Sequence, residues 1–103
     1  NERYAAKAWD DRVGLAVMLV AARRIRDEGI QVPSEVVWVA TTQEEIGLRG
    51  AQTAVALAEP EIGISIEAGV AADFPGIGPT QAQERLGGGP GMFLLDSSMI
   101  PNR

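Results

Sequence analysis

The chain has 103 residues, of which 46% are hydrophobic and 22% charged, a balance typical of a single folded domain. Its net charge of −5 argues against nucleic-acid binding, and the lack of cysteine and histidine excludes disulfides and thiolate or imidazole metal ligands within it. The longest apolar stretch, Val13 to Ala22, is too short to span a bilayer, and no signal-peptide pattern opens the sequence. We therefore expect a cytoplasmic protein that binds neither nucleic acid nor membrane.

The first third of the chain predicts a strand followed by a helix. Tyr4–Trp9 is a short apolar run that favours a strand, and Asp11–Glu28 places apolar side chains at helical spacing. Asp10 or Asp11 can cap the start of this helix, and Gly29 stands where a left-handed residue commonly ends one.

The rest of the chain continues this alternation. Val36–Thr41 is β-branched, aromatic and apolar on both faces, as in a buried strand of a parallel sheet. Leu48–Leu57 predicts a second helix that ends before Pro60, and Ile62–Ile66 predicts a third strand. Met92–Leu95 favours a last strand. The order strand, helix, strand, helix, strand predicts an α/β fold with a mainly parallel sheet.

Carboxylates follow three of the predicted strands, at Asp10–Asp11, Glu44–Glu45 and Glu67. The carboxyl ends of parallel strands lie on one edge of a sheet, so these acids should gather there. Crowded carboxylates repel one another unless cations neutralise them. Two divalent ions would do so, with one Asp bridging them and Glu45 and Glu67 each binding one. In an extended chain neighbouring residues point in opposite directions, which leaves one of the two glutamates free as a general base.

A simpler interpretation of the same acids remains open. Aspartate commonly caps helices, and acidic side chains favour the positive ends of helices. The pattern alone is therefore also compatible with a non-catalytic interaction domain whose acids are caps and solubilising charge.

Four segments match a known family in the same order. They are AWDDRVG at 8–14, TQEEIGLRGA at 42–51, the turn Asp73–Gly76, and the segment 96–102. Over essentially its whole length the chain resembles metallopeptidase family 42, the glutamyl, deblocking and tetrahedral aminopeptidases. The resemblance implies that residues 1–103 form a single partial catalytic domain with a three-layer αβα architecture around a mainly parallel sheet.

The resemblance also implies a role for each matching acid. Asp10 resembles the carboxylate that bridges the two metals, Glu44 the general base that deprotonates the attacking water, and Glu45 a terminal ligand of one metal. Glu67 aligns with the acidic ligand of the other metal, where many members have Asp. The implied reaction removes N-terminal residues from peptides with two zinc, cobalt or manganese ions, in a homo-oligomeric cytoplasmic enzyme.

The chain departs from the family in two respects. Each metal of the family site also takes a histidine, and this chain has none. We also expect the chain to lack the inserted dimerisation domain and both flanks of the catalytic domain. We therefore expect a fragment with little or no peptidase activity of its own, which need not hold metal.

A glycoside hydrolase of the endoglucanase type is the alternative enzyme class. That chemistry requires two carboxyl groups about 5 to 10 Å apart across one glycosidic bond, one of them protonated. Adjacent Glu44 and Glu45 that point apart do not supply this arrangement.

Overall fold

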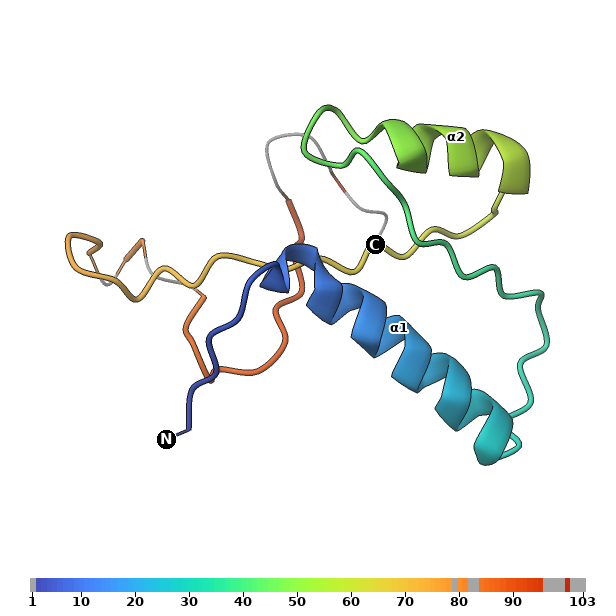
Figure 1. Ribbon diagram of the computed structural model, residues 1–103, viewed down its shortest axis with the longest axis horizontal. Coiled ribbons are helices and arrows are strands. Elements are labelled where there is room, and N and C mark those ends of the chain that lie inside the picture. The colour runs from blue at the N-terminus through green and yellow to red at the C-terminus, as the bar shows by residue number, and fades with distance from the viewer. Residues whose placement is uncertain (1, 79, 82–83, 96–99, 101–103) are drawn as a thin grey trace. The chain divides into compact units, whose positions relative to one another are not determined.

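The computed structural model of the chain describes residues 2–78, 80–81, 84–95 and 100. These residues contain two helices, α1 (Trp9–Asp27) and α2 (Arg49–Ala58), and no strand (Figure 1). The chain divides into two compact units, residues 1–68 and 69–103, and both helices belong to the first. No helix among the described residues combines the length and apolarity that a membrane crossing requires.

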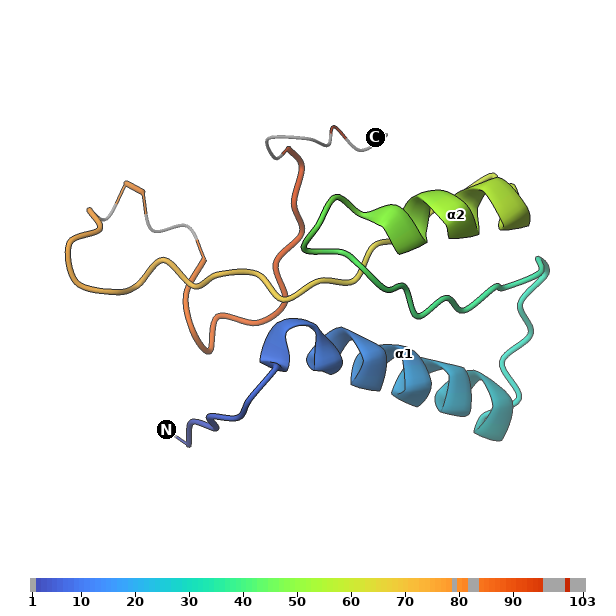
Figure 2. The ribbon, with the colours of Figure 1, turned by 45° about the horizontal axis from the view of Figure 1, so that its top comes forward.

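The helix α1 confirms the prediction of a helix over Asp11–Glu28 (Figure 2). Asp10 and Asp11 have non-helical backbone angles, so the regular helix begins at Arg12. The acidic side chains in its first turn and the basic side chains in its last turn both interact favourably with the helix dipole. Beyond the last turn Gly29 has φ +63°, a left-handed backbone that glycine adopts without strain, which confirms its expected position.

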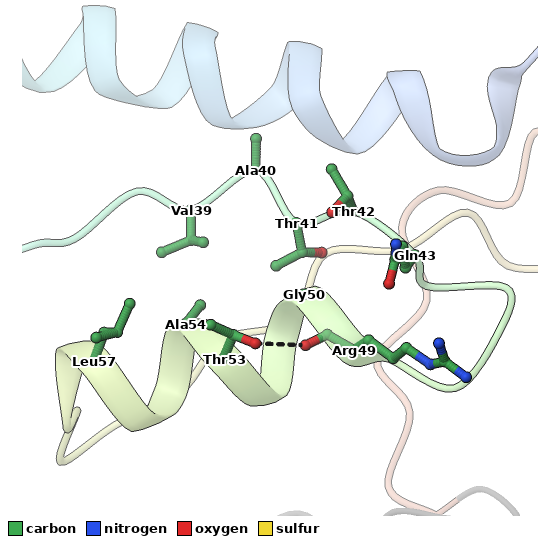
Figure 3. A pocket seen from close by; sticks show the side chains of 10 residues that line it. All are labelled: Val39, Ala40, Thr41, Thr42, Gln43, Arg49, Gly50, Thr53, Ala54 and Leu57. Atoms are coloured by element: carbon green, nitrogen blue, oxygen red, sulfur yellow. Dashed lines mark hydrogen bonds between the residues drawn. The ribbon is translucent and has the colours of Figure 1, made fainter.

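The helix α2 confirms the second predicted helix, Leu48–Leu57, to within one residue at each end. Thr53 Oγ1 donates a hydrogen bond of 3.1 Å to the carbonyl oxygen of Arg49, one turn earlier (Figure 3). Glu59 caps the C-terminal end of the helix, with φ +44° and its N–H donated to the Val55 oxygen at 2.9 Å. Pro60 follows and has no N–H with which to continue the ladder.

The predicted three-layer αβα fold is wrong for this structure. The segments 36–41, 62–66 and 92–95 form no sheet ladder, and Trp9, at the end of the first predicted strand, is the first residue of α1. A strand exists only when a neighbour satisfies its backbone N–H and C=O groups, and a strand apolar on both faces needs cover on both. The described residues supply neither: Val37 is 58% exposed and Ile64 82% exposed.

The described residues also contain no buried hydrophobic side chain, and α1 and α2 do not pack on each other. The local pattern of the sequence therefore produces helices here without a shared core. Helix formation needs only hydrogen bonds within one segment, whereas a sheet needs bonds between segments. This difference explains why the predicted helices are present and the predicted strands are not.

The second unit is held by turns. The N–H of Ile77 donates to the Phe74 oxygen at 3.4 Å, and Gly76 has φ +97°, which confirms the turn predicted at Asp73–Gly76. Asp73 Oδ1 accepts a hydrogen bond of 3.3 Å from the Leu86 N–H. Most of the predicted family segment 96–102, namely residues 96–99 and 101–102, lies outside the described residues.

Candidate active site

Asp10 and Asp11 lie where the chain turns into α1, and the two side chains differ in their surroundings. The Asp11 carboxylate is half-buried, and its Oδ1 accepts a hydrogen bond of 2.9 Å from the N–H of Gly14. Asp10 is exposed. The peptide bond that joins the two residues is cis. Asp11 thus caps the helix through the amide three residues later, which leaves the Asp10 carboxylate free to bind another group.

Glu44 and Glu45 lie on an exposed loop whose ends are joined by backbone hydrogen bonds. The N–H of Gly50 donates to the Thr42 oxygen at 3.0 Å, and the N–H of Arg49 donates to the Gln43 oxygen at 3.3 Å. We call these two bonds, formed by residues 42–43 and 49–50, the neck of the loop. The neck is thus closed by the backbone, and Gln52 Nε2 in α2 adds a side-chain hydrogen bond of 3.3 Å to the Gly47 oxygen in the loop.

The tip of the loop is a turn rather than the extended chain that the sequence suggested. The N–H groups of Gly47 and Leu48 both donate to the Glu44 oxygen at 3.0 Å, and Gly47 has φ +108°. Glu44 and Glu45 therefore do not lie in an extended chain whose neighbouring side chains must point in opposite directions. A turn of this kind needs a residue that tolerates positive φ, and glycine supplies it.

An open cavity of about 400 Å³ lies between the segment 39–43 and α2 (Figure 3). It is lined by Val39–Gln43, Arg49, Gly50, Thr53, Ala54 and Leu57. None of the four predicted site acids lines it. The cavity is therefore a feature of the contact between this segment and α2, separate from the acids.

Glu67 is the predicted site residue whose pKa is shifted. Loss of hydration raises the pKa of its carboxyl group, and repulsion from Asp11, Asp10 and Glu44 raises it further. A hydrogen bond of 3.1 Å from the Ala68 N–H to Glu67 Oε1 acts in the opposite direction. The structure thus brings Asp10, Asp11 and Glu44 within electrostatic range of Glu67. Glu45 is not among the groups that act on it.

The described residues meet one requirement of a metal centre and lack another. Carboxylate oxygens are ligands that divalent cations accept, and three acids, Asp11, Asp10 and Glu44, act electrostatically on Glu67 here. However, no three acidic side chains among the described residues lie close enough to hold an ion together. The donor chemistry suits a divalent cation, whereas the described geometry forms no coordination cage.

Comparison with known sequences identifies the family. Residues 1–103 match the M42 glutamyl aminopeptidase family. The chain belongs to this family. The M42 assignment agrees with the resemblance that the Asp-Asp-Arg and Gln-Glu-Glu segments indicate.

Several curated relatives of this M42 chain carry aminopeptidase names. The "Putative aminopeptidase FrvX" of Escherichia coli is 34% identical over 103 residues, which is 100% of this chain and 28% of that protein. The lysyl aminopeptidase of Pyrococcus furiosus is 39% identical over 67 residues, 65% of this chain and 18% of that protein. The glutamyl aminopeptidase of Lactococcus lactis is 30% identical over 100 residues, 97% of this chain and 26% of that protein.

The M42 chain therefore spans about 28% of the length of the first of these relatives. No solved structure matches it significantly. Sequence reasoning named Asp11 as a possible cap but gave no role to Gly14 or Gly50, both of which contact the site segments. The spacing carried only part of the signal: a glycine three residues after an aspartate is compatible with a cap, but the pattern does not say which of the two adjacent acids makes it.

Proposed function

We propose that the chain is part of the catalytic domain of an aminopeptidase that removes N-terminal residues from peptides with the help of two divalent cations. The family match over residues 1–103 carries this proposal. The relatives' names support it, since they describe aminopeptidases. The cytoplasmic location, the homo-oligomeric assembly and the use of zinc, cobalt or manganese are part of the same proposal.

In this proposal the four acids have different tasks. Asp10, Glu45 and Glu67 would hold the two cations through their carboxylate oxygens. Cations held there would supply Lewis-acid chemistry. Glu44 accepts a proton from the attacking water at its carboxylate and passes it to the departing amine nitrogen. The location of Glu44 on a loop with a backbone-closed neck supports this role, because a general base must be held in place while it is exposed to substrate.

The experiment uses the complete protein that contains this chain. Release of the N-terminal residue from short peptides is compared for the wild type, Glu44→Gln and a matched control, Glu59→Gln, which changes an exposed acid at the end of α2. Removal of the base should lower kcat by about 10² to 10⁴-fold. The control should keep full activity. Normal turnover by Glu44→Gln would rule out the assigned role.

The substrate class is tested with the same preparation. Chelation should abolish peptidase activity and a divalent salt should restore it. Release of reducing sugar from cellulose without peptide hydrolysis would instead establish the glycoside hydrolase alternative. If neither substrate is consumed and no divalent ion binds, the non-catalytic interpretation of the acids stands.

A matched assay on the 103-residue chain tests whether it is sufficient. The chain lacks histidine and spans a minor part of its relatives' length, so we expect no turnover with added zinc, cobalt or manganese. Robust release of N-terminal residues by this chain would show that the four carboxylates suffice without histidine.

A further inference from the structure

The side chain of Asp11, the neighbour of the predicted metal ligand Asp10, is hydrogen-bonded to the first turn of α1. Its Oδ1 accepts the Gly14 N–H at 2.9 Å. That N–H belongs to the first turn of α1, where backbone donors have no partner within the helix. The side chain is half-buried and its oxygen is engaged, so Asp11 faces the helix rather than a ligand.

Gly14 provides the space that this contact needs. It is the buried residue of α1. A Cβ atom built on it would overlap the Asp11 carboxylate, reaching within 2.7 Å of Oδ1 and closer still to Oδ2. Any larger residue at position 14 must therefore push the Asp11 carboxylate off the helix.

Two contacts hold the backbone around Asp10. The N–H of Arg12 donates to the Ala8 oxygen at 3.3 Å, a bond that closes a turn containing Asp10. The bond between Asp11 and Gly14 holds the next residue along the chain. Asp10 itself is exposed and takes part in neither.

We propose that Asp11 is a positioning residue, which by capping α1 over Gly14 fixes the backbone from which Asp10 presents its carboxylate to metal. The inference rests on the proposed function, because it assumes that Asp10 is a metal ligand. In this task Asp11 acts as a hydrogen-bond acceptor and its charge is not required; the repulsion that its charge exerts on Glu67 is a separate effect. Partners that orient a metal ligand typically affect metal affinity by about 10 to 100-fold when they are removed.

The test exploits the similar capping ability of asparagine and aspartate. Asp11→Asn keeps the acceptor and loses the charge, and Asp11→Ala loses both. In the complete protein, Co²⁺ alone serves as the probe, and its affinity and visible absorption spectrum are measured. We expect Asp11→Asn to retain the wild-type spectrum and affinity, and Asp11→Ala to weaken Co²⁺ binding by about 10 to 100-fold.

Gly14→Ala provides a second route to the same effect, because its Cβ displaces the carboxylate without changing Asp11. Its matched control is Gly63→Ala, where a Cβ would meet no atom within 4 Å. Gly14→Ala should weaken Co²⁺ binding as Asp11→Ala does, and Gly63→Ala should not. Far-UV circular dichroism confirms that each variant keeps its helices.

The NMR shift of the Gly14 amide tests the Asp11–Gly14 contact without metal. In the 103-residue chain, the amide proton of Gly14 should keep its wild-type NMR shift in Asp11→Asn and move in Asp11→Ala. Equal loss of Co²⁺ binding in Asp11→Asn and Asp11→Ala would show that the charge of Asp11 matters, and would overturn the inference. So would unchanged binding in Asp11→Ala, or a displaced Gly14 amide in Asp11→Asn.

Asp10→Asn distinguishes the metal-ligand role of Asp10 from the positioning role of Asp11. If it retains Co²⁺ at wild-type affinity, the assignment of Asp10 as a ligand fails, and with it that part of the proposed function. If it loses Co²⁺ while Asp11→Ala does not, the proposed function survives and the positioning role of Asp11 is rejected.

Discussion

The carboxyl group of Glu67 responds to other acids of the first unit as well as to its own loss of hydration. Its pKa is raised mainly by desolvation, and then by Asp11, Asp10 and Glu44. In a chain without bound cations this repulsion is uncompensated. The effect links acids that are more than fifty residues apart in sequence.

We expect Asp11→Asn to lower the pKa of Glu67 toward its ordinary value, but not fully, because desolvation is the larger cause. Carboxyl NMR titration of the 103-residue chain measures it. The matched control is Asp27→Asn at the far end of α1, which is not among the groups acting on Glu67. A Glu67 pKa that is equal in the wild type and Asp11→Asn would refute the coupling.

The raised pKa of Glu67 also predicts how the stability of the folded chain changes with pH. Below the pKa of Glu67 in the unfolded chain, the carboxyl group is protonated in both states and no repulsion acts. Because the folded chain binds this proton more tightly than the unfolded chain does, protonated Glu67 favours the folded state. As the pH rises through the raised folded-state pKa, Glu67 loses the proton and this stabilisation is lost. The metal-free chain should therefore unfold more readily above this range than below it, and Glu67→Gln should reduce the difference. Thermal unfolding followed at several pH values tests both statements.

Gly50 shows a second constraint at the residue scale. A Cβ at this position would overlap the Thr42 backbone, lying 2.6 Å from its nitrogen. Alanine gains about 1 kcal/mol over glycine in a helix, but overlap with rigid backbone typically costs about 1 to 3 kcal/mol. We expect Gly50→Ala to open the neck, so that the amide of residue 50 exchanges with solvent faster. Gly63→Ala is the control, and unchanged protection at position 50 would contradict the expectation.

At the scale of elements, α2 is expected to be the less stable of the two helices. It has 10 residues, no side chain caps its start, and Leu48 stands there with φ +55°. Isolated helices shorter than about 12 to 15 residues are marginal in water. Asparagine tolerates the left-handed region better than leucine does.

We therefore expect Leu48→Asn to increase the helical population of residues 49–58, as measured by NMR Cα shifts. Leu57→Asn places the same residue inside the helix, where asparagine has a lower helix preference, and should decrease it. A fall in helicity for both variants would mean that Leu48 stabilises α2 by contacts that outweigh its backbone strain.

The elements also show what the sequence could and could not predict. The helix over Asp11–Glu28 was predictable because apolar spacing, acidic start, basic end and Gly29 all agree within one segment. Val36–Thr41 has the composition of a buried strand, but composition cannot supply the neighbour that a strand must bond. The predicted α/β fold was therefore wrong, because a sheet depends on partners, whereas the two helices were predicted correctly because they depend on local hydrogen bonds.

The candidate site divides in the same way. The sequence identified the acids and expected them to converge at a sheet edge. There is no sheet among the described residues, yet Asp10 and Glu44 still act on Glu67 electrostatically. The roles of Asp10, Glu44, Glu45 and Glu67 in binding and catalysis stay predictions. The contact between Asp11 and Gly14 escaped prediction because a capping pattern does not say which of two adjacent acids makes the bond.

At the scale of the whole molecule, the described residues leave large apolar side chains open to water. Leu57, Ile62 and Ile64 are each more than 80% exposed. Exposed apolar surface of this kind favours association. We expect the 103-residue chain to bind the dye ANS and to self-associate with rising concentration, as measured by sedimentation velocity. A sharp monomer without dye binding at high micromolar concentration would contradict this.

The neck of the glutamate loop has a practical consequence. Its two backbone bonds join residues only six and eight positions apart, so nothing distant in the chain is needed to close it. A head-to-tail cyclised peptide covering residues 42–51 should therefore reproduce the loop by itself. Residues 42–51 could then be grafted into an unrelated protein scaffold, where Glu44 and Glu45 would keep the same loop conformation.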